Sequence, residues 1–193
     1  MASQDRHIAA VRRGRGAEGN RGMDDREDLL RPTLALGPHQ AESVSDTERL
    51  TAEDLARGVC RLFRHMGFAP IIEYPLGNGR RADVAAINRK GMIMIAEVKS
   101  GLPDFRSDGK WPDYLDFCDC FYFAVAADFP VDVFNPANDH MQRAGVIVAD
   151  RFGASILREA DEIKMNATRR RAETLRFARR AAARLHHVMD PAF

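Results

Sequence analysis

The chain has 193 residues, which is enough for one domain with a hydrophobic core and additional tails. Its 29 basic and 28 acidic residues leave a net charge of +1, so overall charge alone does not indicate a nucleic-acid partner. Cys60, Cys118 and Cys120 are too few for a disulfide framework, and the longest apolar run is too short to span a membrane. We therefore expect reduced thiols, no membrane partner and a cytoplasmic protein.

The first 48 residues differ in composition from the rest of the chain, being rich in Arg, Gly, Asp and Glu with little periodicity. This composition predicts a flexible polar tail over residues 1–48, without the apolar segment that a secretory signal needs. The run Arg13-Gly14-Arg15-Gly16 leaves open an RGG-like contact with nucleic acid, although a disordered extension is the simpler interpretation. Met1 and Met23 both remain candidates for the true start, and the folded domain is predicted over residues 49–193.

The first predicted element of the domain is a helix that starts after Thr51 and is closed by Gly67. Thr51 is a favourable N-cap, and Glu53 and Asp54 suit the positive end of the helix dipole. Apolar residues recur at helical spacing, at Leu55, Val59, Leu62, Phe63 and Met66. A strand over residues 68–76 and a turn at Gly77-Asn78-Gly79 are predicted next.

Two further strands are predicted over residues 80–88 and 92–100, joined by a short turn that ends in Gly91. Side chains alternate along a strand, so Glu97 and Lys99 point to the same face, and a hairpin register can bring Asp83 beside them. Two neighbouring carboxylates need a partner charge or a cation, and oxygen ligands suit Mg²⁺ or Mn²⁺. A nearby lysine can stabilise negative charge on a phosphate or orient an attacking water.

Beyond this hairpin the sequence predicts a helix from Asp104 to about Cys118, with a break near Pro112. A buried strand follows over residues 120–127. Two short strands are then predicted over residues 145–149 and 154–157.

The resulting order of helix, three strands, helix and strand resembles the core of the PD-(D/E)xK nuclease superfamily. The motif reads Ala82-Asp83 and then Glu97-Val98-Lys99, with Ala82 in place of the proline that names it. This resemblance implies an α/β fold of the restriction-endonuclease type. It also implies a metal-dependent nuclease with Asp83, Glu97 and Lys99 as catalytic residues.

The superfamily further implies an acid on the first helix that contributes to the metal site. Glu53 fits this position, so it joins Asp83 and Glu97 in the predicted ligand set and is added to the predicted catalytic residues. Glu73, on the strand before Asp83, is the rival, because Glu53 is equally well explained as a charge at a helix N-terminus. The sequence leaves the two acids open.

A longer string resembles the MmcB family of bacterial DNA repair proteins. It starts as Glu97-Val98-Lys99-Ser100 and continues with Asp104-Phe105-Arg106, Asp108, Lys110-Trp111-Pro112 and Tyr114. The resemblance covers roughly residues 49–190. It implies a role in DNA damage repair, with DNA and DNA repair proteins as partners and a nucleoid-associated location. It leaves open whether the protein forms a homodimer and whether it cuts DNA.

The segment after Lys99 lies at the rim of the predicted site. Lys110 could contact a DNA phosphate, as could Arg80 and Arg81 just before Asp83. Trp111 could stack on a base, but core packing is the favoured role of a lone tryptophan. Asp104 is equally well explained as a helix cap and as a site residue.

The C-terminal segment predicts a basic amphipathic helix. A 3-4-3-4 apolar stripe is expected to pack against the domain; it consists of Leu175, Ala178, Ala182, Leu185 and Met189. Basic residues lie on the opposite side and are expected to face solvent, namely Arg169, Arg176, Arg180 and Arg184. Acids that could match them are nearly absent from the segment, so DNA phosphate contacts and a solvated face both remain open. The adjacent pair His186-His187 is predicted to be exposed and not to bind metal.

Two classes of function therefore follow. The first is a nuclease that uses Mg²⁺ or Mn²⁺ to hydrolyse phosphodiester bonds in damaged or branched DNA. The second is a DNA-binding or recruitment module with the same fold and no catalysis. The complete Asp83, Glu97 and Lys99 set favours the first class.

Overall fold

The computed structural model describes residues 50–134 and 139–191, so the predicted polar tail and its Arg-Gly run lie outside the described part. The chain divides into two units, residues 1–45 and 46–193, and every element below belongs to the second. In chain order the elements are α1 (Ala52–His65), β1 (Phe68–Pro75), β2 (Arg81–Asn88), β3 (Ile93–Lys99), α2 (Leu102–Ser107), α3 (Pro112–Leu115), β4 (Cys120–Val125), the 3-10 helix η1 (Val131–Phe134), α4 (Asp139–Arg143), β5 (Gly145–Ala149), β6 (Ala154–Arg158) and α5 (Ala167–Met189).

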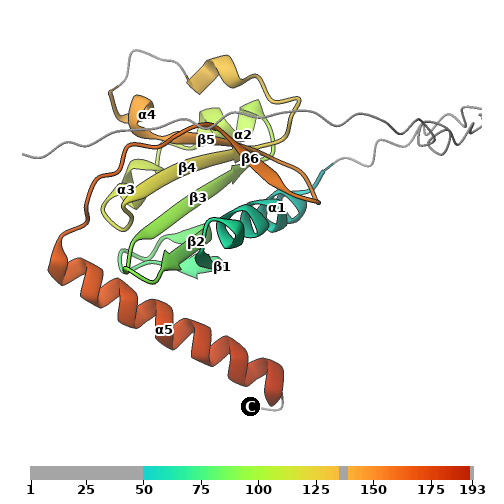
Figure 1. The fold of residues 1–193 in the computed structure, drawn as a ribbon. Coiled ribbons are helices and arrows are strands. Elements are labelled where there is room, and N and C mark those ends of the chain that lie inside the picture. The colour runs from blue at the N-terminus through green and yellow to red at the C-terminus, as the bar shows by residue number, and fades with distance from the viewer. Residues whose placement is uncertain (1–49, 135–138, 192–193) are drawn as a thin grey trace, which may run out of the picture. The chain divides into compact units, whose positions relative to one another are not determined.

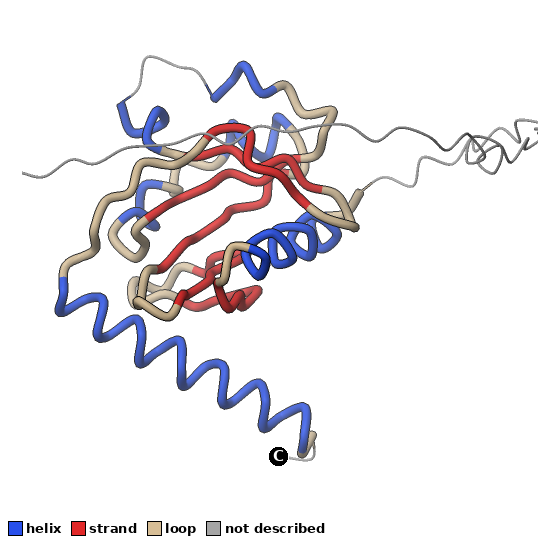
Figure 2. The backbone as a smooth tube through the Cα atoms, viewed as in Figure 1, coloured by secondary structure: helices blue, strands red, loops and turns tan. Residues whose placement is uncertain are grey.

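Within the described residues, six strands form one mixed sheet in the order β1-β2-β3-β4-β5-β6 (Figure 1). The contacts of β4 with β3 and β5 are parallel, and the other neighbouring strands are antiparallel. Every residue of β3 and β4 is buried, as expected for central strands that are covered on both faces. Figure 2 shows the sheet between helical segments, with α5 as a long separate helix near β1 and β2.

Helix α1 covers one face of the sheet. Its start is fixed by a capping box in which the Asp54 N–H donates to the Thr51 hydroxyl at 3.1 Å and the Thr51 N–H donates to the Asp54 carboxylate at 3.0 Å. Gly67 ends the helix at a φ of +84°, which glycine adopts without strain. The predicted start and end of this helix are therefore confirmed. Its buried residues pack with the β2 and β3 side chains that point to this face, including Val84, Ala86, Met94, Ala96 and Val98.

The second face of the sheet carries an aromatic core. Trp111 is buried and stacks on Phe121, with ring centroids 5.6 Å apart, so the expected packing role of the lone tryptophan is confirmed. Phe105 of α2 lies edge-on to Phe123 at 5.4 Å and holds that short helix on the sheet. Ala85, Ile93 and Ile95 belong to the same cluster.

The predicted second helix is interrupted as expected before Pro112, but its pieces are shorter than predicted. Helix α2 has Pro103 in its first turn, and α3 begins at Pro112 itself, because proline is tolerated only where no N–H is needed. Asp104 is not the cap of α2, because the N-cap is Gly101 and has no side-chain capping bond; Asp104 lies in the first turn and accepts a hydrogen bond from the Ser100 N–H at 3.2 Å. Helices η1 and α4 were not predicted.

The prediction for the long C-terminal helix is wrong about its rotation: the apolar stripe does not face the domain. Helix α5 packs through Phe177, whose ring lies 5.4 Å from that of Tyr74, and through Arg170, which pairs with Asp119 at 2.5 Å. Leu175 and Leu185 are each 61% exposed. The anchors Arg170 and Phe177 lie on another side of the helix, and their contacts with distant residues determine its rotation.

Other expectations concern covalent state and membrane association. Cys60, Cys118 and Cys120 are free thiols, and the latter two are buried, as predicted. His186 and His187 are exposed in the last turn of α5, also as predicted. Among the described residues, no helix combines the length and apolar character that crossing a bilayer requires.

Candidate active site

Three of the predicted catalytic residues, Asp83, Glu97 and Lys99, meet at one place on the second face of the sheet. Strands β2 and β3 pair so that Val84 lies opposite Ala96, which puts Asp83 and Glu97 opposite each other one residue further along. The Asp83 N–H donates to Glu97 Oε1 at 3.2 Å, and Asp83 Oδ2 accepts from the Val98 N–H at 2.8 Å. The predicted hairpin register is therefore confirmed, and two carboxylates share one edge of a buried face.

The two carboxylates are poorly compensated as charges. Burial raises the pKa of Glu97 to about 8, and the neighbouring Asp83 carboxylate adds to this increase. Burial also raises the pKa of Asp83, although the hydrogen bond from Val98 and the charge of Lys99 act in the opposite direction. Holding two carboxylates together without full compensation is typical of sites that bind a cation or move a proton.

Lys99 lies on the same face, and only 5% of its surface is exposed to solvent. Its Nζ donates to Asp108 Oδ2 at 2.6 Å, while Asp108 Oδ1 accepts from the Lys110 N–H at 3.0 Å. Burial alone would raise the pKa of Asp108, but these hydrogen bonds outweigh it, and the pKa lies below its ordinary value. The loop after β3 thus folds back to hold the ammonium group beside the two carboxylates.

The two candidates for a third acid occupy different places. The structure does not bring Glu53 to the site, because α1 covers the opposite face of the sheet. The Glu53 side chain is 66% exposed and pairs with Arg57 at 2.6 Å. We therefore remove Glu53 from the ligand and catalytic sets.

Glu73 lies on β1 between Ile72 and Tyr74, whose partners Val84 and Ala82 flank Asp83. Its charge raises the pKa of Asp83, and its own carboxylate forms an ion pair with Arg81. Glu73 has a φ of +51°, a left-handed conformation that a residue with a side chain rarely adopts. Of the two candidates, Glu73 is the acid next to Asp83.

The donor set suits a cation that needs few protein ligands. Among the described residues, no group of three His, Cys, Asp or Glu side chains is placed to hold a metal ion. Mg²⁺ is commonly held by only one or two carboxylates together with waters and substrate phosphates. The described hydrogen bonds use one oxygen each of Asp83 and Glu97. Asp83 Oδ1 and Glu97 Oε2 are therefore left as ligand atoms for such an ion.

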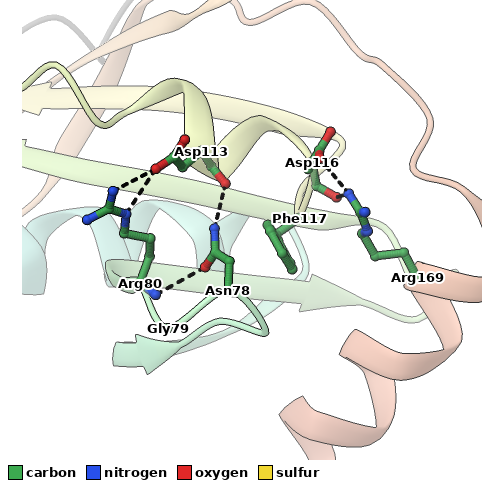
Figure 3. Close-up of a pocket in the computed structure, with 7 residues that line it drawn as sticks. All are labelled: Asn78, Gly79, Arg80, Asp113, Asp116, Phe117 and Arg169. Carbon is green, nitrogen blue, oxygen red and sulfur yellow. Dashed lines mark hydrogen bonds and ion pairs between the residues drawn. The ribbon is translucent and has the colours of Figure 1, made fainter.

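A groove on the same domain collects three of the predicted DNA contacts. A cavity of about 450 Å³ lies between the β1–β2 turn, α3 and the start of α5, and it is lined by Asn78, Gly79, Arg80, Asp113, Asp116, Phe117 and Arg169 (Figure 3). A second cavity of about 680 Å³ shares part of this lining and adds Arg176. Arg80 is far in sequence from Arg169 and Arg176 of α5, and the fold brings all three to one surface.

These arginines are paired with acids, contrary to the expectation for the C-terminal helix. Arg80 pairs with Asp113 at 2.7 Å, and Arg169 pairs with Asp116 at 2.8 Å (Figure 3). Arg176 lies 3.3 Å from the buried Glu173. The sequence could not show the ion pairs of Arg80 and Arg169, because Asp113 and Asp116 come from the segment around α3.

The remaining predicted DNA contacts are distributed around the domain. Arg184 donates to the Glu73 main-chain oxygen at 3.1 Å and so faces the domain instead of solvent. Arg81 is 67% exposed in its ion pair with Glu73, and Lys110 and Arg180 are exposed. Lys110 directly follows the loop that holds Lys99.

Comparison with known proteins identifies the family. The family described as "DNA repair protein MmcB-like" matches residues 40–192, which is most of the chain. The chain belongs to this family. A solved structure, the SPO1766 protein of unknown function from Silicibacter pomeroyi, matches at 39% sequence identity and a TM-score of 0.66. The match covers 72% of this chain and 92% of that one. A comparison with curated proteins found no match.

Membership in the MmcB-like family indicates a role in DNA repair. The structure adds two residues that the sequence reasoning did not place in the site. Asp108 pairs with Lys99, and Tyr114 donates to the Arg81 main-chain oxygen at 3.2 Å. Burial raises the pKa of Tyr114, and the charges of Glu97, Asp108 and Asp83 add to the effect, so its hydroxyl stays protonated near the site. Asp108 and Tyr114 both belong to the MmcB-like segment that follows Lys99, and this was the sequence signal that could have placed them near the site.

Proposed function

We propose that this MmcB-like protein is a PD-(D/E)xK-type deoxyribonuclease that depends on Mg²⁺ or Mn²⁺ and acts on damaged or branched DNA during repair. The observation that carries the proposal is the arrangement of Asp83, Glu97 and Lys99. Two adjacent carboxylates with raised pKa values lie beside a buried ammonium group. A structural role alone does not require such a costly group of charges.

The side chains divide the chemistry between them. Asp83 and Glu97 would hold the divalent cation, which supplies a Lewis acid and a water of lowered pKa at the phosphate. Lys99 would stabilise the negative charge that develops on the phosphate oxygens, or orient the attacking water. Asp108 holds the Lys99 side chain in position through its 2.6 Å contact with Nζ. Glu73 is the candidate for a third, weaker contribution to the cation site.

The groove of Arg80, Arg169 and Arg176 gives the proposed path of the DNA. Arg80 directly precedes β2 and is three residues from Asp83, which corresponds to about 10 Å of extended chain. A phosphate backbone bound there would also lie within reach of the catalytic residues. Phosphate groups would then replace Asp113 and Asp116 as partners of the arginines.

A nuclease assay on single-stranded, duplex, flap and junction DNA with Mn²⁺ tests this proposal. We expect cleavage of at least one substrate, and loss of that cleavage in Asp83→Ala, Glu97→Ala and Lys99→Ala. Lys90→Ala, an exposed residue of the β2–β3 turn, serves as the matched control. Equal cleavage by wild type and all three site variants would reject the assignment.

A non-catalytic DNA-binding module is the second candidate. It is favoured by the absence, within the described residues, of a three-ligand metal cluster. This function predicts DNA binding that is unaffected by Mn²⁺ and no cleavage of any substrate in the same assay.

A further inference from the structure

Helix α5 carries an apolar surface that its own domain does not cover. We call this surface the α5 stripe, and it consists of Leu175, Ala178, Ala182, Leu185 and Met189. All five residues are exposed, and the large ones are 61% exposed at Leu175 and Leu185 and 76% at Met189. Scattered apolar residues on a surface need no explanation, but a row along one helix indicates a contact with something else.

The contacts that hold α5 on the domain leave this row outside. Residues Glu173 and Phe177 are buried, and Tyr74 contacts both of them. Arg184 extends the same side by donating to Glu73. At 100° per residue the α5 stripe lies on a different side of the helix, so no rearrangement of the domain is needed to expose it.

The spacing of the stripe is that of a helix-packing seam. Leu175, Ala178, Ala182, Leu185 and Met189 follow the 3-4-3-4 pattern of the a and d positions in coiled coils. Small alanines between larger residues allow another helix to approach closely. The geometry therefore favours a helical occupant over a strand or a loop.

The charges near the α5 stripe indicate which charge a helix that binds there should carry. Arg179 and His186 run along one border of the stripe, and Arg171 lies in line with the stripe, one turn before Leu175. The one carboxylate in the sequence of α5 is that of Glu173, which is buried. A second copy of α5 would place arginine against arginine, and like charges at such borders oppose association. An acidic helix would meet only complementary charge.

We propose that the α5 stripe is a docking surface for an acidic amphipathic helix of a partner protein. The surface is separate from Asp83, Glu97 and Lys99, so the proposal does not depend on nuclease activity. It assigns to this helix the recruitment of another protein, with the arginine borders setting the choice of partner.

The test uses the full chain and two synthetic helical peptides. Both peptides carry leucine at the a and d positions, but one has glutamate and the other lysine at the bordering positions. In fluorescence-anisotropy titrations, the glutamate peptide should bind at least about tenfold more tightly than the lysine peptide. The double variant Arg179→Glu, His186→Glu should reverse that preference, because it changes the border and leaves the stripe intact.

A second pair of variants tests the stripe itself. Leu175→Ser with Leu185→Ser should weaken binding of the glutamate peptide at least about tenfold without changing the thermal midpoint, because both residues are exposed. Leu157→Ser, on β6 and 57% exposed, is the matched control and should bind as wild type. Equal binding of the two peptides, or binding unaffected by the leucine variants, would overturn the proposal.

Two other outcomes would assign the surface to a different occupant and also overturn the proposal. One is a wild-type dimer in sedimentation equilibrium that the double leucine variant converts to monomer. The other is binding to vesicles with anionic lipid headgroups that requires the same leucines.

Discussion

Two acidic sites on the same sheet differ in how well hydrogen bonds and ion pairs compensate their charge. Asp119, just before β4, is 3% exposed and accepts hydrogen bonds from the Ile93 and Met165 N–H groups as well as from Arg170. Burial alone would raise the pKa of Asp119, but these partners outweigh it and lower the pKa below its ordinary value. Asp83 and Glu97 have fewer compensating contacts, and their pKa values are raised.

This difference distinguishes Asp119, whose charge has a structural role, from Asp83 and Glu97, for which we propose a functional role. Asp119 joins β3, β4 and α5 in one network, so its ionised form stabilises the fold. Asp83 and Glu97 are held close together at a cost in stability, because each disfavours the charge of the other. Proteins commonly accept such a cost where a site needs it.

The largest effect is expected on catalysis. Lys99→Ala should lower the cleavage rate on the best substrate by about 10²–10³-fold, as loss of a group that stabilises transition-state charge does elsewhere. DNA affinity should change little, because the proposed role of Lys99 is at the reacting phosphate. Single-turnover cleavage and anisotropy titrations measure the two effects separately. A Lys99→Ala protein that cleaves as fast as wild type would remove this lysine from the mechanism.

The next largest effect is expected on stability at the structural charge. Asp119→Ala should lower the free energy of unfolding by about 3–5 kcal/mol, because it leaves Arg170 and two buried N–H groups without their partner. Asp116→Ala removes the exposed pair with Arg169 and should cost at most about 1 kcal/mol. Urea denaturation of both variants measures the difference. Similar losses in the two variants would contradict the distinction.

The pH dependence of stability should have opposite signs in the two places. Glu97 has a folded-state pKa of about 8 against an ordinary 4.5, so between these values the folded protein keeps a proton that the unfolded chain releases. Its contribution to the free energy of unfolding therefore falls as pH rises from about 4.5 to 8. Asp119 has a lowered pKa, so the stability it provides is present above 3.8 and is lost as pH falls through its folded-state pKa.

Urea denaturation in EDTA at several pH values checks this sign. Glu97→Gln should flatten the decline between pH 5 and 8, while Glu53→Gln, at an exposed position on the opposite face, should not. An identical decline in wild type and Glu97→Gln would show that Glu97 does not carry the bound proton.

The smallest effect is expected in the salt dependence of DNA binding. Replacing Arg80 and Arg169 by alanine should flatten the log–log slope of affinity against salt by up to about 2 units, at about 0.9 per duplex phosphate contact. Arg64→Ala, on α1, is the matched control and should leave the slope unchanged. An unchanged slope in the groove variants would place the DNA elsewhere, past Arg81, Lys110 or Arg180.

The catalytic corner could be predicted from sequence because it depends on local rules. A short turn and the twofold alternation of β2 and β3 fix which side chains share a face, so Asp83, Glu97 and Lys99 follow directly. The place of Glu53 could not be predicted in this way. An amphipathic helix shows which of its sides is buried, but not which face of the sheet it covers.

The orientation of α5 shows the same limit more clearly. Its strongest periodic pattern is the exposed α5 stripe, whereas the side that packs is defined by Arg170, Glu173 and Phe177. The partners of that side are Asp119 and Tyr74, which lie far away in sequence. Likewise, the acids that neutralise Arg80 and Arg169 come from the segment around α3. Contacts of this kind are decided by tertiary structure and leave little trace in local spacing.

Calorimetric titration with Mn²⁺ examines the two carboxylates without a substrate or a partner. We expect wild type to bind Mn²⁺ more tightly as pH rises towards 8, since the cation replaces the proton of Glu97. Asp83→Ala and Glu97→Ala should each largely abolish this binding, whereas Glu53→Ala should bind as wild type. Equal Mn²⁺ affinity in wild type, Asp83→Ala and Glu97→Ala would contradict the assignment of these two carboxylates as a metal site.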